Sequence, residues 1–198
     1  MVRYLQTETA ILADKPQVLM MSAVDRFGMA QALEAAGCRL ICGDLIFVLG
    51  VPIPLNSLKA LEWVAHVFAP LVAQLPFSML YPTGAKQEES SPRAEHLFQQ
   101  ADIIAGDFHF IRRFMPAKLE GKTIITNTTT PEDVQMLQDR GVKALVTTTP
   151  EFNGRSFGTN VMEALLVALS GKKRELEPAE YEELLVKADI TPRITWLN

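Results

Sequence analysis

The chain has 198 residues, 48% of them apolar and 21% charged, which is the composition of a globular protein of one domain. Its net charge of −4 and the lack of a long basic run give no support to nucleic-acid binding. The N-terminus is too polar for a signal peptide, and the most apolar stretch, Leu61–Leu80, is too interrupted to span a membrane. We therefore expect a cytoplasmic protein in which Cys38 and Cys42 are buried thiols.

Short apolar runs alternate with helix-forming segments along the chain. Five runs are predicted strands: Gln17–Met21, Arg39–Cys42, Asp102–Ala105, Lys122–Thr126 and Val142–Thr147. The predicted helices are Arg3–Leu12, Met29–Ala36, Leu58 to about Leu75, Arg93–Gln100, Phe110–Pro116, Pro131–Arg140, Thr159–Ser170 and Pro178 to about Val186. This alternation predicts a Rossmann-like, three-layer α/β/α fold with a mainly parallel sheet of about five strands.

We expect residues 1–198 to form a single domain with distinct ends. Residues 1–15 hold a leading helix, residues 76–92 a long loop, and residues 175–198 a C-terminal helix followed by a tail from Ile190. A helix that leads straight into the first strand suggests an upstream domain that is missing here. The predicted helix from Leu58 has a wide apolar face, which fits either plain core or a contact with another domain or with the second chain of a homodimer.

The first strand is followed by a loop that has the outline of a dinucleotide-binding turn. This loop, Ser22–Gly28 (SAVDRFG), keeps only Gly28 of the G-x-G-x-x-G fingerprint. The helix that follows offers N–H groups to a phosphate, and Arg26 can add a charged contact, whereas Asp25 repels a phosphate unless it caps the helix or pairs with Arg26. An ordinary capped turn is the alternative. Asp44, 16 residues after Gly28, is either an acid for the ribose hydroxyls or a solvated acid at a strand end.

Polar clusters follow every predicted strand. They are Ser22–Gly28, Gly43–Asp44, Gly106–His109, Asn127–Thr130 and Thr147–Gly158. Parallel strands bring such clusters to one edge of the sheet, where α/β proteins bind their ligands. The sequence therefore predicts a crevice for a small molecule at this edge, although loops are also polar simply because water solvates them.

Individual residues in these clusters each have a functional and a structural interpretation. His109, beside Asp107, is a candidate acid–base group or a structural hydrogen-bonding residue. Arg155 and Ser156 can hold a phosphate or a substrate carboxylate, or anchor their loop. Lys86, the one basic residue of the long loop, is a further anion-binding candidate. The candidate cofactor-binding residues are Ser22, Asp25, Arg26, Phe27, Gly28, Asp44, Asn127, Thr128 and Thr129. No two histidines have metal-ligand spacing, so no metal is expected.

Long segments of the chain resemble a known bacterial family. They are SAVDRFGMAQAL, GDLIFVLGVPIPL, YPTGAKQEE, IAGDFHFIRRFMP, GKTIITNTTTPEDV and LVTTTPEFNGRSFGTNVMEALLVAL. Together they resemble the family labelled quinate/shikimate 5-dehydrogenase-like, from about Val2 to the C-terminus. The resemblance implies an NAD(P)-dependent oxidoreductase acting on a cyclic polyol acid, and makes this chain the C-terminal, nucleotide-binding half, with a catalytic Lys–Asp pair in the other domain. Thr126–Thr129 is similar to the Asn-Ala-Thr-like turn of shikimate dehydrogenases, whereas Ser22–Gly28 replaces their glycine-rich loop.

Two classes of function remain open from the sequence. The leading hypothesis is a domain that binds NAD or NADP for hydride transfer, with Asp44 favouring NAD because an acid repels a 2′-phosphate. The alternative is a non-redox enzyme, or a ligand-binding module, that uses the same crevice for another anionic small molecule. In an enzyme of that kind His109, Asp107 and Arg155 are the expected functional residues.

Overall fold

The computed structural model of the protein describes residues 1–72 and 91–198, so Lys86 and most of the predicted loop 76–92 lie outside the described residues. The strands are β1 Gln17–Met20, β2 Arg39–Cys42, β3 Ile103–Ala105, β4 Thr123–Thr126, β5 Ala144–Thr147, β6 Glu151–Phe152, β7 Arg155–Ser156 and β8 Arg193–Trp196. The helices are α1 Val2–Glu8, α2 Phe27–Ala35, the π-helix η1 Asp44–Val48, α3 Leu58–Val72, α5 Glu95–Gln100, α6 Phe108–Phe114, α7 Pro131–Asp139, α8 Thr159–Ser170 and α9 Pro178–Lys187.

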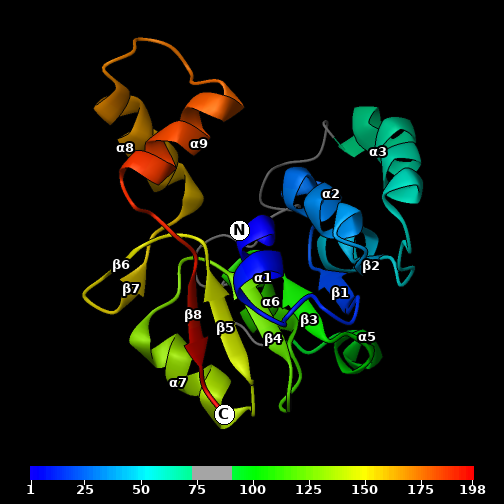
Figure 1. The fold of residues 1–198 in the computed structure, drawn as a ribbon. Helices are drawn as coiled ribbons and strands as arrows, with labels where there is room; N and C mark the ends of the chain where they lie inside the picture. Colours follow the sequence, from blue (N-terminus) through cyan, green and yellow to red (C-terminus); the bar gives the residue numbers. More distant parts are fainter. Residues whose placement is uncertain (73–90) are drawn as a thin grey trace.

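Six strands form one sheet in the order β2-β1-β3-β4-β5-β8, and the first five are parallel (Figure 1). The predicted three-layer α/β fold with five parallel strands is therefore confirmed. The predicted tail from Ile190 is wrong, because Arg193–Trp196 pairs antiparallel with β5 as a sixth strand. Its alternating sequence, RITW, fits an edge strand, and Ile194 is the residue that packs against the core. The predicted loop after β5 contains a second small sheet, the β6–β7 hairpin.

The strand order creates a topological switch point between β1 and β3. The chain passes from β1 through α2 to β2 on one side, and then returns to place β3 on the other side of β1. This order, 2-1-3-4-5, is one of the two common doubly wound arrangements, and it differs from the 3-2-1-4-5-6 order of many dinucleotide-binding domains. Ligands of such sheets bind beyond the carboxyl ends of the strands that flank the switch point.

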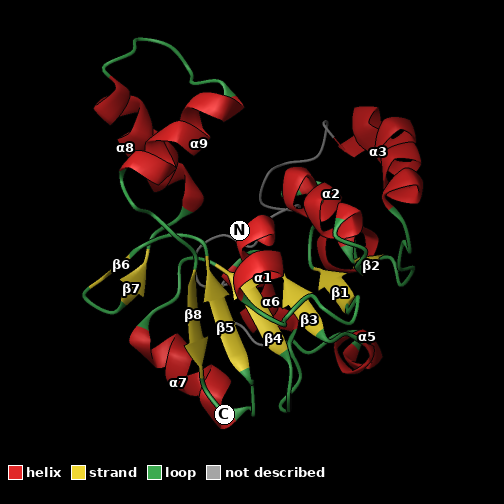
Figure 2. Ribbon diagram, viewed as in Figure 1, coloured by secondary structure: helices red, strands yellow, loops and turns green. Residues whose placement is uncertain are grey.

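Helices cover both faces of the sheet (Figure 2). Helices α1, α2 and α3 pack on one face, against alternate strand residues such as Val18, Met20 and Ile125. Helices α5, α6 and α7, together with η1, pack on the other face, against the intervening residues such as Leu19 and Ile124. Because both faces are covered, the central strands consist of buried residues throughout, which explains their unbroken apolar runs.

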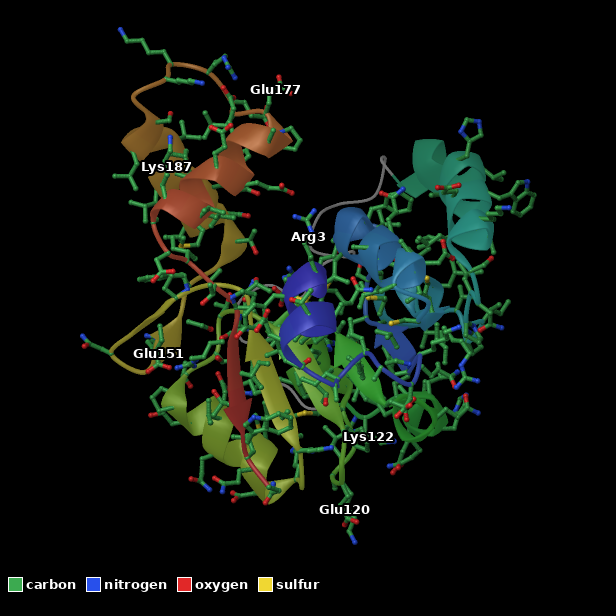
Figure 3. The ribbon with its side chains drawn as sticks, in the orientation of Figure 1. Arg3, Glu120, Lys122, Glu151, Glu177 and Lys187 are labelled. Carbon is green, nitrogen blue, oxygen red and sulfur yellow. The ribbon has the colours of Figure 1, made fainter. Side chains whose placement is uncertain are left out.

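Helices α8 and α9 form a helical hairpin beyond the carboxyl edge of the sheet, the upper edge in Figure 1. Glu177, at the start of α9, lies far from Glu120 and Lys122, which mark the opposite edge (Figure 3). Met162 and Leu166 of α8 are buried beneath the hairpin. The helical hairpin therefore stands over the same edge at which the sequence predicts a ligand.

Helix α3 divides its apolar side chains between two environments. Leu58 and Leu61 are buried, as expected of core residues. Trp63, Val67 and Phe68 are exposed to 65%, 49% and 43%, so plain core does not account for them. The homodimer contact suggested by this helix remains a prediction. No helix among the described residues has the length and apolar character needed to cross a membrane.

Candidate functional site

The loop after β1 is held in place by Asp44, at the start of η1. The two carboxylate oxygens of Asp44 accept hydrogen bonds from the backbone N–H groups of Ala23 and Val24, each at 3.0 Å. The Ser22 hydroxyl lies 3.3 Å from Asp44 and donates a shorter bond, 2.7 Å, to Asp25. Asp44 is only 8% exposed, so its interpretation as a solvated acid is wrong. Its contacts are those of an internal acceptor that fixes the loop, and none of them supports the predicted ribose contact.

Burial gives this acid and its neighbour Cys42 unusual protonation properties. Burial raises the pKa of Asp44, and the hydrogen bonds from Val24, Ala23 and Ser22 partly oppose that rise. Burial also raises the pKa of the Cys42 thiol to about 12, with further contributions from the negative charges of Asp44 and Glu34. Both cysteines are free and buried, which confirms the prediction of buried thiols.

The N-terminus of α2 faces the switch point without a side-chain cap. Arg26 occupies the N-cap position, and its side chain makes no capping hydrogen bond. A Cβ added at Gly28 would have no heavy atom within 4 Å, so the first turn of α2 is open on this side. The Arg26 guanidinium lies 3.8 Å from the Asp107 carboxylate, which follows β3. Pairing with Asp25 was one of two possibilities that the sequence left open, and the structure adds a contact of Arg26 across the switch point.

Asp107 has a second contact that stabilises the start of α6. Its Oδ1 accepts the backbone N–H of His109 at 2.9 Å, which is an N-cap hydrogen bond. His109 itself is half-buried in the first turn of α6, and its predicted acid–base role remains a prediction. Gly106 permits the close approach of the two loops, because a Cβ there would lie 2.8 Å from the Cβ of Met21.

Asn127 forms a bridge at the ends of β4 and β5. Its Nδ2 donates to the hydroxyls of Thr148 and Thr159 at 2.7 and 3.3 Å, and its Oδ1 accepts the Thr148 N–H at 2.9 Å. Asn127 is 3% exposed, so its amide belongs to this internal network, as the structural interpretation proposed. Thr148 and Thr159 could not be recognised as its partners from the sequence, since no spacing rule connects three separate loops.

The next two residues of this turn differ sharply. Thr128 is exposed, with its backbone in the left-handed region at φ 63°, a conformation that is rare for a β-branched residue and is enriched at functional sites. Thr129 is buried, and its N–H donates to the Ser156 hydroxyl at 2.8 Å. Ser156 therefore anchors the β6–β7 hairpin, which favours the structural interpretation of this residue.

Arg155, the other predicted anion-binding residue of the β6–β7 hairpin, is exposed. The pKa of Glu132 in α7 is lowered first by its backbone N–H and by Thr130, with a smaller effect from the charge of Arg155. Arg155 thus lies within the electrostatic range of an acid, and its predicted anion-binding role remains a prediction. Among the described residues, no contact joins Arg155 to His109, which lies beyond β3.

The predicted site residues therefore fall into two groups along one edge. The first group surrounds the switch point and consists of the loops after β1 and β3. The second group follows β4 and β5 and centres on Asn127. Strands lie about 4.8 Å apart, so the tips of β1 and β5, three strands apart, are separated by roughly 14 Å. The described parts of the chain contain no group of three or more His, Cys, Asp or Glu residues suited to a metal ion.

Comparison with known proteins gives one match. A family model described as "Domain of unknown function (DUF8754)" covers residues 1–197. Neither the curated proteins nor the solved structures give a match.

Proposed function

We propose that this chain, a member of the DUF8754 family, binds NAD or NADP along the carboxyl edge of its sheet, as the nucleotide-binding domain of a quinate/shikimate dehydrogenase-like oxidoreductase. The observation that carries the proposal is the switch point, where Arg26 and the uncapped start of α2 meet the loop after β3. The sequence resemblance supports the redox class. When bound, the cofactor supplies hydride transfer, and the protein supplies binding and orientation.

The residues at the switch point suit a phosphate group. A helix N-terminus concentrates N–H donors and a partial positive charge, and a guanidinium presents several donors in one plane. At 3.8 Å the contact between Arg26 and Asp107 is longer than a hydrogen bond, so a phosphate can compete for the guanidinium. Gly28 lets the ligand approach the backbone, since no neighbouring atom fills the space beside it.

The second group of residues lies where the far end of an extended ligand would reach. The separation of roughly 14 Å between the tips of β1 and β5 leaves room for a dinucleotide to lie along the edge. Thr128 offers an exposed hydroxyl there, whereas the Asn127 side chain is already engaged with Thr148 and Thr159. Because Asp44 is engaged by the loop after β1, it no longer favours NAD over NADP, and both cofactors are to be tested.

The decisive test is isothermal titration of NAD and NADP into the pure protein, with two variants and one control. Gly28→Asp places a carboxylate in the first turn of α2, which favours the helix but repels a phosphate, so binding should vanish with no loss of thermal stability. Arg26→Ala should weaken binding by about tenfold, the usual worth of one charge-assisted contact. Arg39→Ala removes an exposed arginine at the opposite end of β2 and should change nothing. The proposal is contradicted if neither NAD nor NADP gives heat at millimolar concentration. It is also contradicted if Gly28→Asp binds a cofactor as tightly as the natural chain does.

A second candidate is a non-redox site for a smaller anion at the same switch point. The acidic groups of Asp25 and Asp107 near Arg26 favour it, because they make the loops less positive than a pyrophosphate cradle. Titration of inorganic phosphate and of acetate separates the two possibilities. If either ion binds and both dinucleotides fail, with Gly28→Asp abolishing that binding, the second candidate replaces the first.

A further inference from the structure

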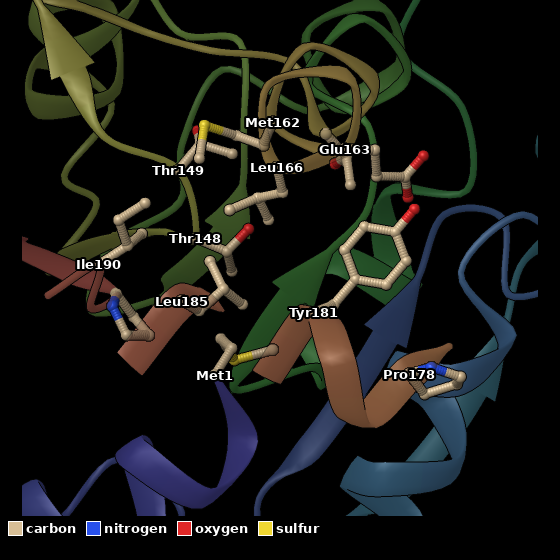
Figure 4. Close-up of a pocket in the computed structure, with 12 residues that line it drawn as sticks. Met1, Thr148, Thr149, Met162, Glu163, Leu166, Pro178, Tyr181, Leu185 and Ile190 are labelled. Carbon is tan, nitrogen blue, oxygen red and sulfur yellow. The ribbon is translucent and has the colours of Figure 1, made fainter. Parts of the chain in front are cut away.

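A cavity of about 460 Å³ lies between the α8–α9 helical hairpin and the end of β5 (Figure 4). Its volume falls in the range of small-molecule sites, about 300 to 1,000 Å³. Most of its wall is apolar, with Met162 and Leu166 from α8 and Leu185 from α9. Thr148, at the end of β5, forms part of the floor. The cavity thus has the apolar lining of a ligand pocket and opens beside the carboxyl edge of the sheet.

Two polar side chains, from different helices, line this cavity. Glu163 comes from α8 and Tyr181 from α9, and Figure 4 shows the Glu163 carboxylate and the Tyr181 hydroxyl pointing toward one another. The cavity is also lined by Thr148, Thr149 and Thr159, whose hydroxyls are already engaged. Thr148 and Thr159 form hydrogen bonds with Asn127, and Thr149 donates one to the Phe157 carbonyl. A carboxylate beside an aromatic ring, within a mainly apolar wall, is a combination that recognises an organic cation.

We infer that this cavity is a binding site for a small apolar amine, whose body packs on Met162, Leu166 and Leu185 and whose ammonium group meets Glu163 and Tyr181. The same carboxylate repels phosphates and carboxylates. The cavity is therefore distinct from the switch point proposed for the dinucleotide phosphates, and the inference does not depend on that proposal. Tyr181 adds an aromatic face and a hydroxyl acceptor for the ammonium protons.

Three indole compounds with the same apolar body and different head groups test the inference: tryptamine, tryptophol and indole-3-acetate. An amine of about 12 non-hydrogen atoms is expected to bind with a Kd of about 1 mM. We therefore propose titration of the full chain by NMR, with isotope-labelled leucine methyl groups as reporters. Tryptamine should shift the Leu166 and Leu185 methyl signals saturably. Tryptophol should bind about tenfold more weakly, because it lacks the charge, and indole-3-acetate more weakly still.

Three substitutions assign the effect to the cavity. Glu163→Gln should reduce the affinity for tryptamine by about tenfold and leave that for tryptophol unchanged, because only the charged contact is lost. Leu185→Trp should fill the cavity and abolish binding of both compounds. Glu183→Gln, an exposed site on α9, is the matched control and should have no effect. Glu163 is exposed, so its variant is expected to fold even if Leu185→Trp does not.

Each of the other outcomes overturns the inference. These are the absence of saturable shifts with tryptamine, binding of indole-3-acetate as tight as that of tryptamine, and an unchanged tryptamine affinity in Glu163→Gln. Loss of dinucleotide binding in Gly28→Asp with intact tryptamine binding would show that the two sites are separate, as inferred.

Discussion

The Arg26 guanidinium lies 3.8 Å from the Asp107 carboxylate, and this contact joins the two loops that leave the sheet at its switch point. Both side chains are partly exposed, at 20% and 31%, so the ion pair itself contributes little stability, at most about 1 kcal/mol. Asp107 also caps α6 through the His109 N–H. The Asp107 carboxylate thus has two roles. It stabilises α6 through the His109 N–H, and it competes with a phosphate for Arg26.

Two substitutions at Asp107 separate these contacts. Asn is a good N-cap, so Asp107→Asn should keep the stability of the protein, and removal of the charge should raise its affinity for phosphate-bearing ligands by about fivefold. Asp107→Ala should raise the affinity similarly but lose about 1 kcal/mol of unfolding free energy with the cap. Urea unfolding and calorimetric titration measure the two effects. An unchanged affinity in both variants would show that Asp107 does not compete for Arg26.

The sheet and its helices could be predicted because each strand is an apolar run covered on both faces. The exceptions share a physical cause. Strand β8 is an edge strand of four residues with only part of its surface in the core, and two-residue strands such as β6 and β7 give no periodic signal. The local residue pattern of a strand does not show with which other strand it pairs.

The location of the candidate site, at the carboxyl edge of the sheet, could be predicted from the sequence, but the contacts between its residues could not. The polar clusters do gather at the carboxyl ends, since the five strands are parallel. The partners of Arg26, Asn127 and Ser156 come from distant loops, so spacing along the chain did not reveal them. The cavity beneath the helical hairpin was missed for the same reason, because α9 meets α8 and the end of β5 only in three dimensions.

A further prediction concerns Asp44 as the anchor of the loop after β1. Asp44→Ala leaves the N–H groups of Ala23 and Val24 without their acceptor and should cost about 2 kcal/mol of unfolding free energy. Asp44→Asn should also be destabilising, since an amide has one oxygen for two N–H donors and sets its own NH₂ against the other. Urea unfolding at neutral pH gives both values. A variant as stable as the natural chain would mean that the loop finds other partners.

The direction in which the free energy of unfolding changes with pH tests the effect of burial on Asp44. Burial raises the folded-state pKa above its ordinary value, so the folded protein binds the proton more tightly than the unfolded chain does. This group therefore favours folding most at low pH, and its contribution falls as the pH rises from the ordinary aspartate value through the higher folded value. The difference in unfolding free energy between the natural chain and Asp44→Asn should decrease across that window. A difference that increases with pH would show that the hydrogen bonds outweigh burial.

Thiol reactivity tests the environment of β2. Burial raises the pKa of Cys38, and that of Cys42 rises to about 12, so neither thiol is ionised at pH 8 in the folded protein. Both should resist a thiol-specific reagent such as DTNB until denaturant is added, when two equivalents react. Val24→Cys, at a site 52% exposed, is the control and should react at once under native conditions. Rapid reaction of the natural chain would show that β2 opens readily.

Glu180 makes the stability of the α8–α9 helical hairpin depend on pH in the acid range. Hydrogen bonds from Arg174, Lys172 and the Glu177 N–H lower the pKa of Glu180 to about 2. These contacts link the segment that joins α8 to α9 with the start of α9. Because the folded-state pKa lies below the unfolded value, the stabilisation is complete above the unfolded value and is lost as the pH falls toward 2.

The helical hairpin should consequently lose a small part of its local stability in acid while the sheet is unaffected, because these ion pairs are exposed and the core of the sheet contains none of them. Hydrogen exchange measured by mass spectrometry between pH 5 and pH 3, after correction for the intrinsic exchange rate, should show reduced protection in residues 171–187 and not in β1 or β4. Glu180→Gln keeps much of the side-chain shape but carries no charge, so it should show the low protection at both pH values. If that variant keeps full protection at pH 5, the ion pairs do not hold the hairpin, and the packing of Met162 and Leu166 alone accounts for its position.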